Sequence, residues 1–346
     1  MSSKSFVQSL PKAELHLHLE GSIEPLTLAE LSRRHNTPLG TENSRYDTIG
    51  SGDILTEEDV RQLYAYKDFN GFLMAFKSVT ERLRTAEDYE LATYRLMQKL
   101  RQQNVAHAEV YVSAGVVRWR GQDFRPIFDG MERGREHGQR DFGVSLLWIF
   151  DAVRHFGPEP AAEVFALAAS LRDRNVVGIG IGGDERRGPA EWFQDLYKKA
   201  ADQGLRLTAH AGETGGPDSV WGALNIGAER IGHGLSIIRD PELQEVLAQK
   251  QIAVEVCVSS NLRTGLCAAV TEHPLRTFFD GGLMVTLNTD DPAMFQTSLC
   301  REYEIAADEF GFTNDQLREL ARNSFEASFL PVEKKLRYLQ QIDFGA

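Results

Sequence analysis

The residues with the clearest chemical potential are histidines and carboxylates that lie at the ends of apolar segments. His16 and His18 are separated by one residue within the apolar segment 13–19, so on a β-strand both imidazoles point to the same face. Two buried histidines without partners are costly, and a divalent metal would supply a shared partner. His210 and Asp290 follow two other apolar segments and complete the set. Nitrogen and oxygen ligands without sulfur suit one zinc ion with an open position for water.

Three further residues beside this set could perform acid–base or positioning chemistry. Glu213 follows the third histidine of the set by three residues, and a carboxyl near the metal but not bound to it can shuttle protons between water and substrate. His233, in Arg-Ile-Gly-His-Gly, could be a fifth ligand, a base, or a group that stabilises the attacking hydroxide. Asp291 adjoins Asp290, so one carboxylate can bind the metal while the other turns toward substrate. An Asp-Asp pair before Pro292 also fits a helix N-cap, and both roles could coexist.

Eight apolar segments would have to position these residues. Several are nearly continuous in Val, Ile and Leu, as strands buried on both faces should be. The segments are 13–19, 106–112, 143–150, 176–181, 205–209, 230–233, 252–258 and 283–287. The third and sixth have the weakest strand patterns, and helical spacing fills stretches such as 161–172, 189–203 and 241–249. Eight β-then-α units predict an α/β fold, a (β/α)8 TIM barrel, in which the carboxyl ends of the strands share one face.

One region interrupts the alternation of strands and helices after the first strand. Residues 36 to about 85 are charged and contain glycine, and they end in a helical run over 68–83. Phe69, Phe72, Leu73 and Phe76 recur at spacings of three and four, which places them on one apolar helix face. This helix could simply pack on the rim of the barrel, or it could be a lid that supplies apolar contacts to a bound ring. The two readings are compatible, and we expect one domain over residues 1–346.

The bulk composition excludes several classes of partner. The chain has 346 residues with a formal net charge of −12, which argues against binding nucleic acid or an anionic membrane, because both need a basic surface. Three cysteines without a Cys-x-x-Cys pair make a disulfide scaffold or a thiolate zinc site improbable. The N-terminus lacks an apolar signal-type segment, and no apolar run reaches membrane-spanning length. We therefore expect a cytoplasmic enzyme with a small-molecule substrate, and the sequence predicts no oligomeric state.

The other five histidines call for less specific interpretations. His35, His137 and His273 lie in polar stretches and are expected to be solvated. His107 opens a strand and fits a core position. His155 follows the third strand, where it could hold a metal ligand from outside or have no role in the site.

Five motifs resemble those of the adenosine deaminase family in order and approximate spacing. They read Pro11-Lys-Ala-Glu-Leu-His-Leu-His-Leu-Glu-Gly21, Gly182-Gly-Asp-Glu185, His210-Ala-Gly-Glu213, Ile231-Gly-His-Gly234 and Asn288-Thr-Asp-Asp-Pro292, and together they span nearly the whole chain. The cytidine-deaminase type of zinc enzyme is a different family with a Pro-Cys-x-x-Cys motif, which does not occur here.

The resemblance implies residue roles as well as a barrel fold. The positions that match the zinc ligands are His16, His18, His210 and Asp290. Zinc would make hydroxide available near neutral pH, and the hydroxide would add to C6 of a 6-aminopurine. The other matches are Glu213 for protonation of N1, His233 for orienting and deprotonating the water, Asp291 for a hydrogen bond to N7, and the Gly183 backbone N–H for N3. The products would be ammonia and an inosine-type purine.

The departures from the family pattern bear on the substrate. Glu20 stands where adenosine-specific members commonly have an aspartate that is thought to contact the ribose 5′-hydroxyl, and adenine deaminases commonly carry Glu there. In contrast, Gly182-Gly-Asp-Glu185 keeps the form found in nucleoside deaminases. Ser260 and Asn261 match the family's Cys-Pro-x-Ser-Asn motif, although Val258 replaces its proline.

A nucleoside with a modified 5′ position would fit both clues. 6-Aminodeoxyfutalosine, a menaquinone-pathway intermediate that some members of the family deaminate, carries a 3-carboxyphenyl group there. Arg186 and Arg187 follow the fourth strand, and an arginine fork suits a carboxylate, although the pair could equally form a solvated turn. Arg118 and Arg120 are other candidates. Adenosine is the first expectation, 6-aminodeoxyfutalosine is close to it, and adenine follows.

Two rival classes remain to be weighed. Related amidohydrolases that act on cyclic amides or phosphoesters mostly bind two metals and use a lysine at the fourth strand. Gly183 occupies that region here, which favours a single metal. A zinc-binding relative without activity is the non-enzyme alternative, and it is disfavoured because every presumed catalytic position is intact.

Overall fold

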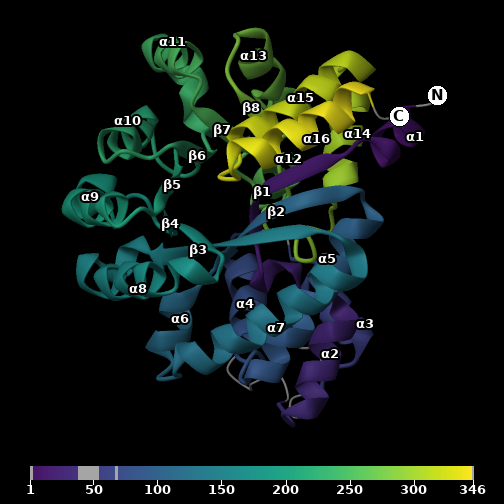
Figure 1. Ribbon diagram of the computed structural model, residues 1–346, viewed down its shortest axis with the longest axis vertical. Coiled ribbons are helices and arrows are strands. Elements are labelled where there is room, and N and C mark those ends of the chain that lie inside the picture. Colours follow the sequence, from purple (N-terminus) through teal and green to yellow (C-terminus); the bar gives the residue numbers. More distant parts are fainter. Residues whose placement is uncertain (1–2, 38–53, 67–68, 345–346) are drawn as a thin grey trace.

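The computed structural model describes residues 3–37, 54–66 and 69–344. Its centre is one sheet of parallel strands in the order β1 to β8 (Figure 1). The strands are Lys12–His18 (β1), Val105–Val112 (β2), Ser145–Val153 (β3), Val176–Gly182 (β4), Arg206–Ala211 (β5), Arg230–His233 (β6), Ala253–Val256 (β7) and Val285–Leu287 (β8). All eight predicted strands are confirmed, and the largest difference is that β3 ends at Val153 rather than Phe150.

Residues beyond the end of β8 close the sheet into a barrel. β8 has only three residues, and the pairing with β1 is an isolated parallel bridge between Leu17 and Asp290. The His18 N–H donates to the Asp290 carbonyl at 2.8 Å, and the Asp290 N–H donates to the His16 carbonyl at 3.0 Å. The Asn288 side-chain oxygen accepts the His16 N–H at 3.1 Å. The contacts that close the barrel therefore also fix the backbone of three predicted metal ligands.

Helices surround the barrel and cover its outer surface (Figure 1). They are Ser3–Ser9 (α1), Pro25–Arg34 (α2), Glu57–Leu63 (α3), Phe69–Thr80 (α4), Ala86–Gln102 (α5), Ala114–Trp119 (α6), Phe124–Phe142 (α7), Pro158–Ser170 (α8), Gln194–Asp202 (α9), Pro217–Asn225 (α10), Pro241–Lys250 (α11), Val258–Arg263 (α12), Leu275–Asp280 (α13), Leu299–Phe310 (α14), Asn314–Ala327 (α15) and Val332–Phe344 (α16). No helix in the described ranges is both long and apolar enough to cross a bilayer.

The insertion after β1 contains two of these helices. α4 confirms the predicted helical run, and α2 and α3 pack on each other at the lower right of the molecule in Figure 1. Phe72 on α4 stacks on Phe295, with ring centroids 5.2 Å apart. Residues 38–53 of the predicted lid, and the side chain of Phe69, lie outside the described part of the chain. The contact of Phe72 places α4 against the segment that follows Asp291, and its role as a lid remains a prediction.

Candidate active site

The barrel brings the four predicted metal ligands together at the carboxyl ends of its strands. His16 and His18 come from β1, His210 comes from β5, and Asp290 follows β8. The Nε2 atoms of His18 and His210 are 3.3 Å apart. Asp290 Oδ1 lies 3.3 Å from His18 Nε2 and 3.6 Å from His16 Nε2. Three imidazole nitrogens and one carboxylate oxygen thus surround one point, although they are far apart in the sequence.

The donor atoms fit a divalent cation. His16, His210, His233 and Asp290 each offer a ligand atom, and these atoms all lie within 4.8 Å of one another. The Nε2 atom of His16 is buried and has no hydrogen-bond partner among the described residues. A buried polar atom without a partner is costly, and a cation would satisfy it. Because the donors are nitrogen and oxygen, the set is compatible with zinc. This group contains His233 in place of the predicted ligand His18, so His233 lies close enough to be considered a ligand, and His18 joins the group through its 3.3 Å distances to His210 and Asp290.

Two site residues hold strained backbone conformations. His233 and Asp290 both have φ of 65°, in the left-handed region that non-glycine residues rarely adopt. Such conformations cost on the order of 1–3 kcal/mol each and tend to occur at functional sites. The strain lies at the two residues that reach the centre from the ends of β6 and β8. The sequence pattern gave no indication of it.

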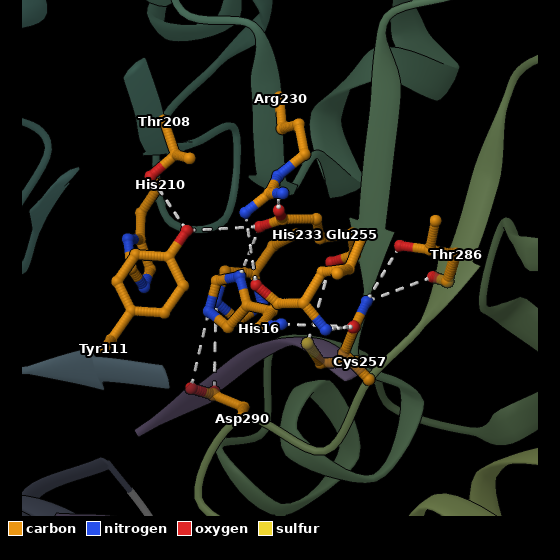
Figure 2. Close-up of polar contacts among 12 residues, drawn as sticks. His16, Tyr111, Thr208, His210, Arg230, His233, Glu255, Cys257, Thr286 and Asp290 are labelled. Atoms are coloured by element: carbon orange, nitrogen blue, oxygen red, sulfur yellow. Dashed lines mark hydrogen bonds and ion pairs between the residues drawn. The ribbon is translucent and has the colours of Figure 1, made fainter. Parts of the chain in front are cut away.

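A buried ion-pair chain supports His16 from behind (Figure 2). His16 Nδ1 lies 2.8 Å from Glu255 Oε2, and Arg230 Nε lies 2.6 Å from Glu255 Oε1. Arg230 also pairs with Glu109, and these side chains are almost fully buried. A carboxylate that accepts from Nδ1 orients the ring so that Nε2 presents its lone pair to the metal. Figure 2 shows His16 between Glu255 and Asp290.

Glu255→Gln tests this support directly. We expect zinc affinity to fall about 10–100-fold, the usual effect of removing a carboxylate that orients a metal-binding histidine. Competition with a chromophoric chelator measures the affinity. Glu242→Gln, an exposed glutamate on α11, is the matched control. Unchanged affinity in a folded Glu255→Gln protein would show that His16 does not need this partner.

The predicted proton shuttle lies at the edge of the centre. Glu213 Oε1 is 3.9 Å from His233 Nε2. Burial raises the pKa of the Glu213 carboxyl to about 8, and the negative charges of Asp290 and Glu185 add to the effect. A carboxyl whose pKa lies near neutrality is suited to both giving and taking a proton. The position and environment of Glu213 therefore agree with the predicted role.

Glu185 anchors the loop that carries this residue. Its carboxylate accepts the backbone N–H groups of Gly212 at 2.7 Å, Glu213 at 2.9 Å, Thr214 at 2.7 Å and Gly215 at 3.0 Å. Burial opposes ionisation, yet the Ser219 hydroxyl and the backbone N–H groups of Gly215, Thr214 and Gly212 hold the pKa of Glu185 below its usual value. Glu185 belongs to one of the five family motifs, but its sequence context does not indicate this role. Only the fold reveals it, because its partners lie on the next strand loop.

Asp291 and Gly183, the two predicted contacts of the purine ring, both have unusual local environments. Asp291 is buried, and its Oδ1 atom has no hydrogen-bond partner among the described residues. Burial and the adjacent Asp290 raise the pKa of Asp291 well above its usual value. Gly183 has φ of 95°, which a side chain would disfavour. No helix begins at Pro292, where the chain forms turns, so the helix N-cap interpretation of the Asp-Asp pair was wrong.

The remaining predicted substrate-binding residues are Glu20, Arg186 and Arg187. Glu20 is buried, and its Oε1 atom accepts the Ser113 N–H at 3.0 Å. Arg186 and Arg187 are exposed, and their backbone N–H groups donate to Asp184 Oδ1 at 3.1 and 3.3 Å. This arrangement agrees with the alternative prediction that the two arginines form a solvated turn, and both guanidinium groups lie at the surface.

Two of the minor histidine predictions were wrong. His273 is buried, with Nε2 3.1 Å from Asn261 Oδ1, and His35 lies 2.6 Å from Asp88. His107 is in the core, as expected. His155 contacts the Asp184 N–H at 3.3 Å, beside Gly183 rather than beside a metal ligand. The polar sequence around His273 suggested solvent, whereas its side chain is enclosed by the fold.

A parallel barrel with a histidine–aspartate centre at its carboxyl end defines the chain as an amidohydrolase-type enzyme. The family model for adenosine deaminase matches residues 11–344. The chain belongs to the adenosine deaminase family, and it is an aminohydrolase that acts on C–N bonds.

Named relatives and solved structures show which members of the family the chain is similar to. The chain is 39% identical over 343 residues to an aminodeoxyfutalosine deaminase of Streptomyces avermitilis, covering 98% of this chain and 92% of the relative. It is 34% identical to an adenine deaminase of Hahella chejuensis, covering 98% of each. The adenine deaminase structure from Arthrobacter aurescens superposes with a TM-score of 0.87 at 29% identity, covering 96% of this chain and 98% of that one. A Burkholderia ambifaria amidohydrolase with bound zinc matches with a TM-score of 0.84 at 25% identity, covering 99% and 93%.

Proposed function

We propose that the protein hydrolyses the 6-amino group of an adenine-type nucleoside to release ammonia. The observation that carries this proposal is the convergence of His16, His18, His210 and Asp290 with Glu213 at the edge of the same centre. One zinc ion per chain held by these four ligands would activate water as a nucleophile near neutral pH.

The other residues would bind the ring and move protons. Glu213 transfers a proton between the attacking water and ring N1, which makes C6 more electrophilic. Asp291, whose raised pKa favours its protonated form, donates a hydrogen bond to N7. The Gly183 N–H meets N3, and His233 orients the water. Phe72 would cover the ring from the lid. Rigid positioning of both reactants supplies much of the rate enhancement in such a site.

A modified nucleoside, 6-aminodeoxyfutalosine, has the best support as the substrate. Two aminodeoxyfutalosine deaminases are 39% and 37% identical to the chain, above the 34% of the Hahella adenine deaminase. The Glu20 Oε1 atom accepts the Ser113 N–H just before α6, and its buried Oε2 atom has no hydrogen-bond partner among the described residues. Glu20 therefore keeps an acceptor for a substrate hydroxyl, and the preference for the modified nucleoside over adenosine rests on the similarity to the two aminodeoxyfutalosine deaminases.

A cleft on the rim could receive the carboxyphenyl group of this substrate. It has a volume of about 810 Å³ and lies between α6 and the start of α8. Trp119 and Phe156 line it with exposed side chains, and their ring centroids are 6.3 Å apart. The ring of Phe156 is 5.1 Å from His155, which adjoins Gly183. Arg118, another predicted candidate for the carboxylate, lines the cleft and pairs with Glu163, whereas Arg186 and Arg187 are not among its lining residues.

A substrate panel tests the function. Ammonia release by the zinc-loaded protein is compared for adenosine, adenine, 5′-deoxyadenosine, S-adenosylhomocysteine and 6-aminodeoxyfutalosine. We expect the highest kcat/KM with the carboxyphenyl nucleoside. A preference for adenosine or adenine would overturn the substrate assignment, and zinc binding without ammonia release from any of them would favour the inactive relative.

Trp119→Ala tests the cleft. One aromatic pair contributes about 0.5–1.5 kcal/mol, so kcat/KM for 6-aminodeoxyfutalosine should fall about 2- to 10-fold, while that for 5′-deoxyadenosine stays constant. Trp192→Ala is the matched control, because Trp192 is exposed and does not line this cleft. An equal loss with both substrates would place Trp119 outside the tail site.

A further inference from the structure

The hydrogen bonds around His233 point to a tautomer opposite to that of the ligand histidines. We propose that His273 and Asn261 are positioning residues that hold the proton of His233 on Nε2, so that His233 acts as a hydrogen-bond donor and not as a metal ligand or a base. This inference rests on the proposed function and concerns the same site.

The tautomers of two predicted ligand histidines provide the comparison for His233. The Nδ1 atom of His16 meets the carboxylate of Glu255 at 2.8 Å, and the Nδ1 atom of His210 meets the Ile181 carbonyl at 3.1 Å. Both partners can only accept, so Nδ1 carries the hydrogen in each ring. In a neutral imidazole the other nitrogen then holds a lone pair. Their Nε2 atoms, which face the centre, are therefore free to bind a metal.

The tautomer of His273 follows from a backbone donor. The Leu275 N–H donates to His273 Nδ1 at 3.2 Å, so Nδ1 must carry a lone pair. Burial lowers the pKa of His273 to about 4, which keeps the ring neutral, and its hydrogen is then on Nε2. This Nε2–H donates to Asn261 Oδ1 at 3.1 Å.

The orientation of the Asn261 amide determines the tautomer of His233. Because Oδ1 of Asn261 accepts from His273, the amide nitrogen points the other way and donates to His233 Nδ1 at 3.2 Å. His233 Nδ1 therefore holds a lone pair, and a neutral His233 carries its hydrogen on Nε2. That N–H faces two acceptors, Glu213 Oε1 and Asp290 Oδ2, each 3.9 Å away.

The assignment separates the readings that the sequence left open for His233. A protonated Nε2 cannot bind a metal or accept a proton from water. It can donate to the attacking oxygen as negative charge builds up there. The ligand set is then His16, His18, His210 and Asp290, and Glu213 receives the proton of the water. The role of base that the family resemblance implies for His233 is replaced by that of a donor.

Nitrogen NMR of the zinc-loaded protein labelled with ¹⁵N-histidine tests the tautomer without substrate. Expected is a protonated Nε2 and a lone-pair Nδ1 for His233, with the reverse for His16 and His210. A metal-bound or lone-pair signal for His233 Nε2 would overturn the proposal. His137→Gln removes an exposed histidine and serves as the assignment control.

Asn261→Asp provides a second test, because the proposal predicts the direction in which kcat changes. The aspartate still accepts from His273 but cannot donate to His233, so the His233 proton should move to Nδ1. We expect kcat to fall about 10²–10³-fold, the usual loss when one transition-state donor is removed, with little change in KM or zinc affinity. If His233 were a base, an Asp–His pair would support it, and kcat would hold or rise.

His273→Gln separates relay from packing, because its amide N–H can replace the donor of the imidazole. We expect the nitrogen pattern of His233 to persist in this variant and to be lost in His273→Glu, which cannot donate when ionised. Loss of the pattern in both would overturn the relay. If the variants do not fold, the nitrogen signals of the unmodified protein decide alone. These signals do not depend on which purine is deaminated, so failure here is distinguishable from failure of the proposed function.

Discussion

Glu213→Gln is expected to lower kcat about 10²–10⁴-fold while zinc stays bound, because general acid–base groups contribute rate factors of this size. Glutamine keeps the shape of the side chain but cannot carry a proton between water and N1. Glu185 fixes the backbone of residues 212–215, so the loop should keep its conformation in the variant. Steady-state kinetics together with zinc analysis measures both parts of the prediction.

The control for this experiment is Asp218→Asn, an exposed carboxylate on the neighbouring helix α10. It should leave kcat and the zinc content unchanged. Activity of Glu213→Gln within a few-fold of the unmodified protein would contradict the assigned role. Loss of zinc in that variant would instead place Glu213 among the metal ligands.

Removal of the metal is the second change with a large expected effect. A chelator should reduce ammonia release to the background rate, and zinc should restore it, since no side chain in the centre can replace the activation of water. The melting temperature should fall as well. A ligand present at a thousand times its dissociation constant stabilises the folded state by about 4 kcal/mol, and the apoprotein loses that contribution.

A variant separates the metal effect from damage by the chelator. His210→Ala should bind zinc weakly and show a low melting temperature that zinc does not raise, whereas His137→Gln should respond as the unmodified protein does. Full activity in a preparation shown by elemental analysis to contain no divalent metal would contradict a metal-dependent mechanism.

The fold was predictable because each strand is buried on both faces. That burial leaves runs of Val, Ile and Leu in several of the strands, whereas β6, with four residues, had one of the two weakest strand patterns. The convergence of the predicted metal ligands was predictable for a related reason. A barrel collects the ends of its strands at one face, so polar residues placed just after apolar segments must converge.

The supporting residues could not be predicted in the same way. Glu255 lies within an apolar strand and acts on His16, which is far away in the sequence. His273 sits in a polar stretch, yet its ring packs near Phe310 and bonds to Asn261. Their partners lie on neighbouring strands or loops, and a pattern along one chain does not show which residues meet across a barrel. The side chain of Phe69 and the 38–53 part of the insertion fall outside the described ranges.

The hydrogen bonds between Glu185 and the loop of Glu213 also bear on how substrate preference can differ between members of such a family. Glu185 follows Gly183 by two residues and ties the loop after β4 to the loop after β5. In the proposed binding mode these two loops contact N3 and N1 of the purine. Because Glu185 fixes the loops relative to each other, they would hold the six-membered ring in one position. The tail would lie elsewhere, against α6 and α8. In this proposal the residues that bind the purine ring and those that bind the tail are separate, so substitutions near α6 and α8 would change the preferred tail without changing the binding of the ring.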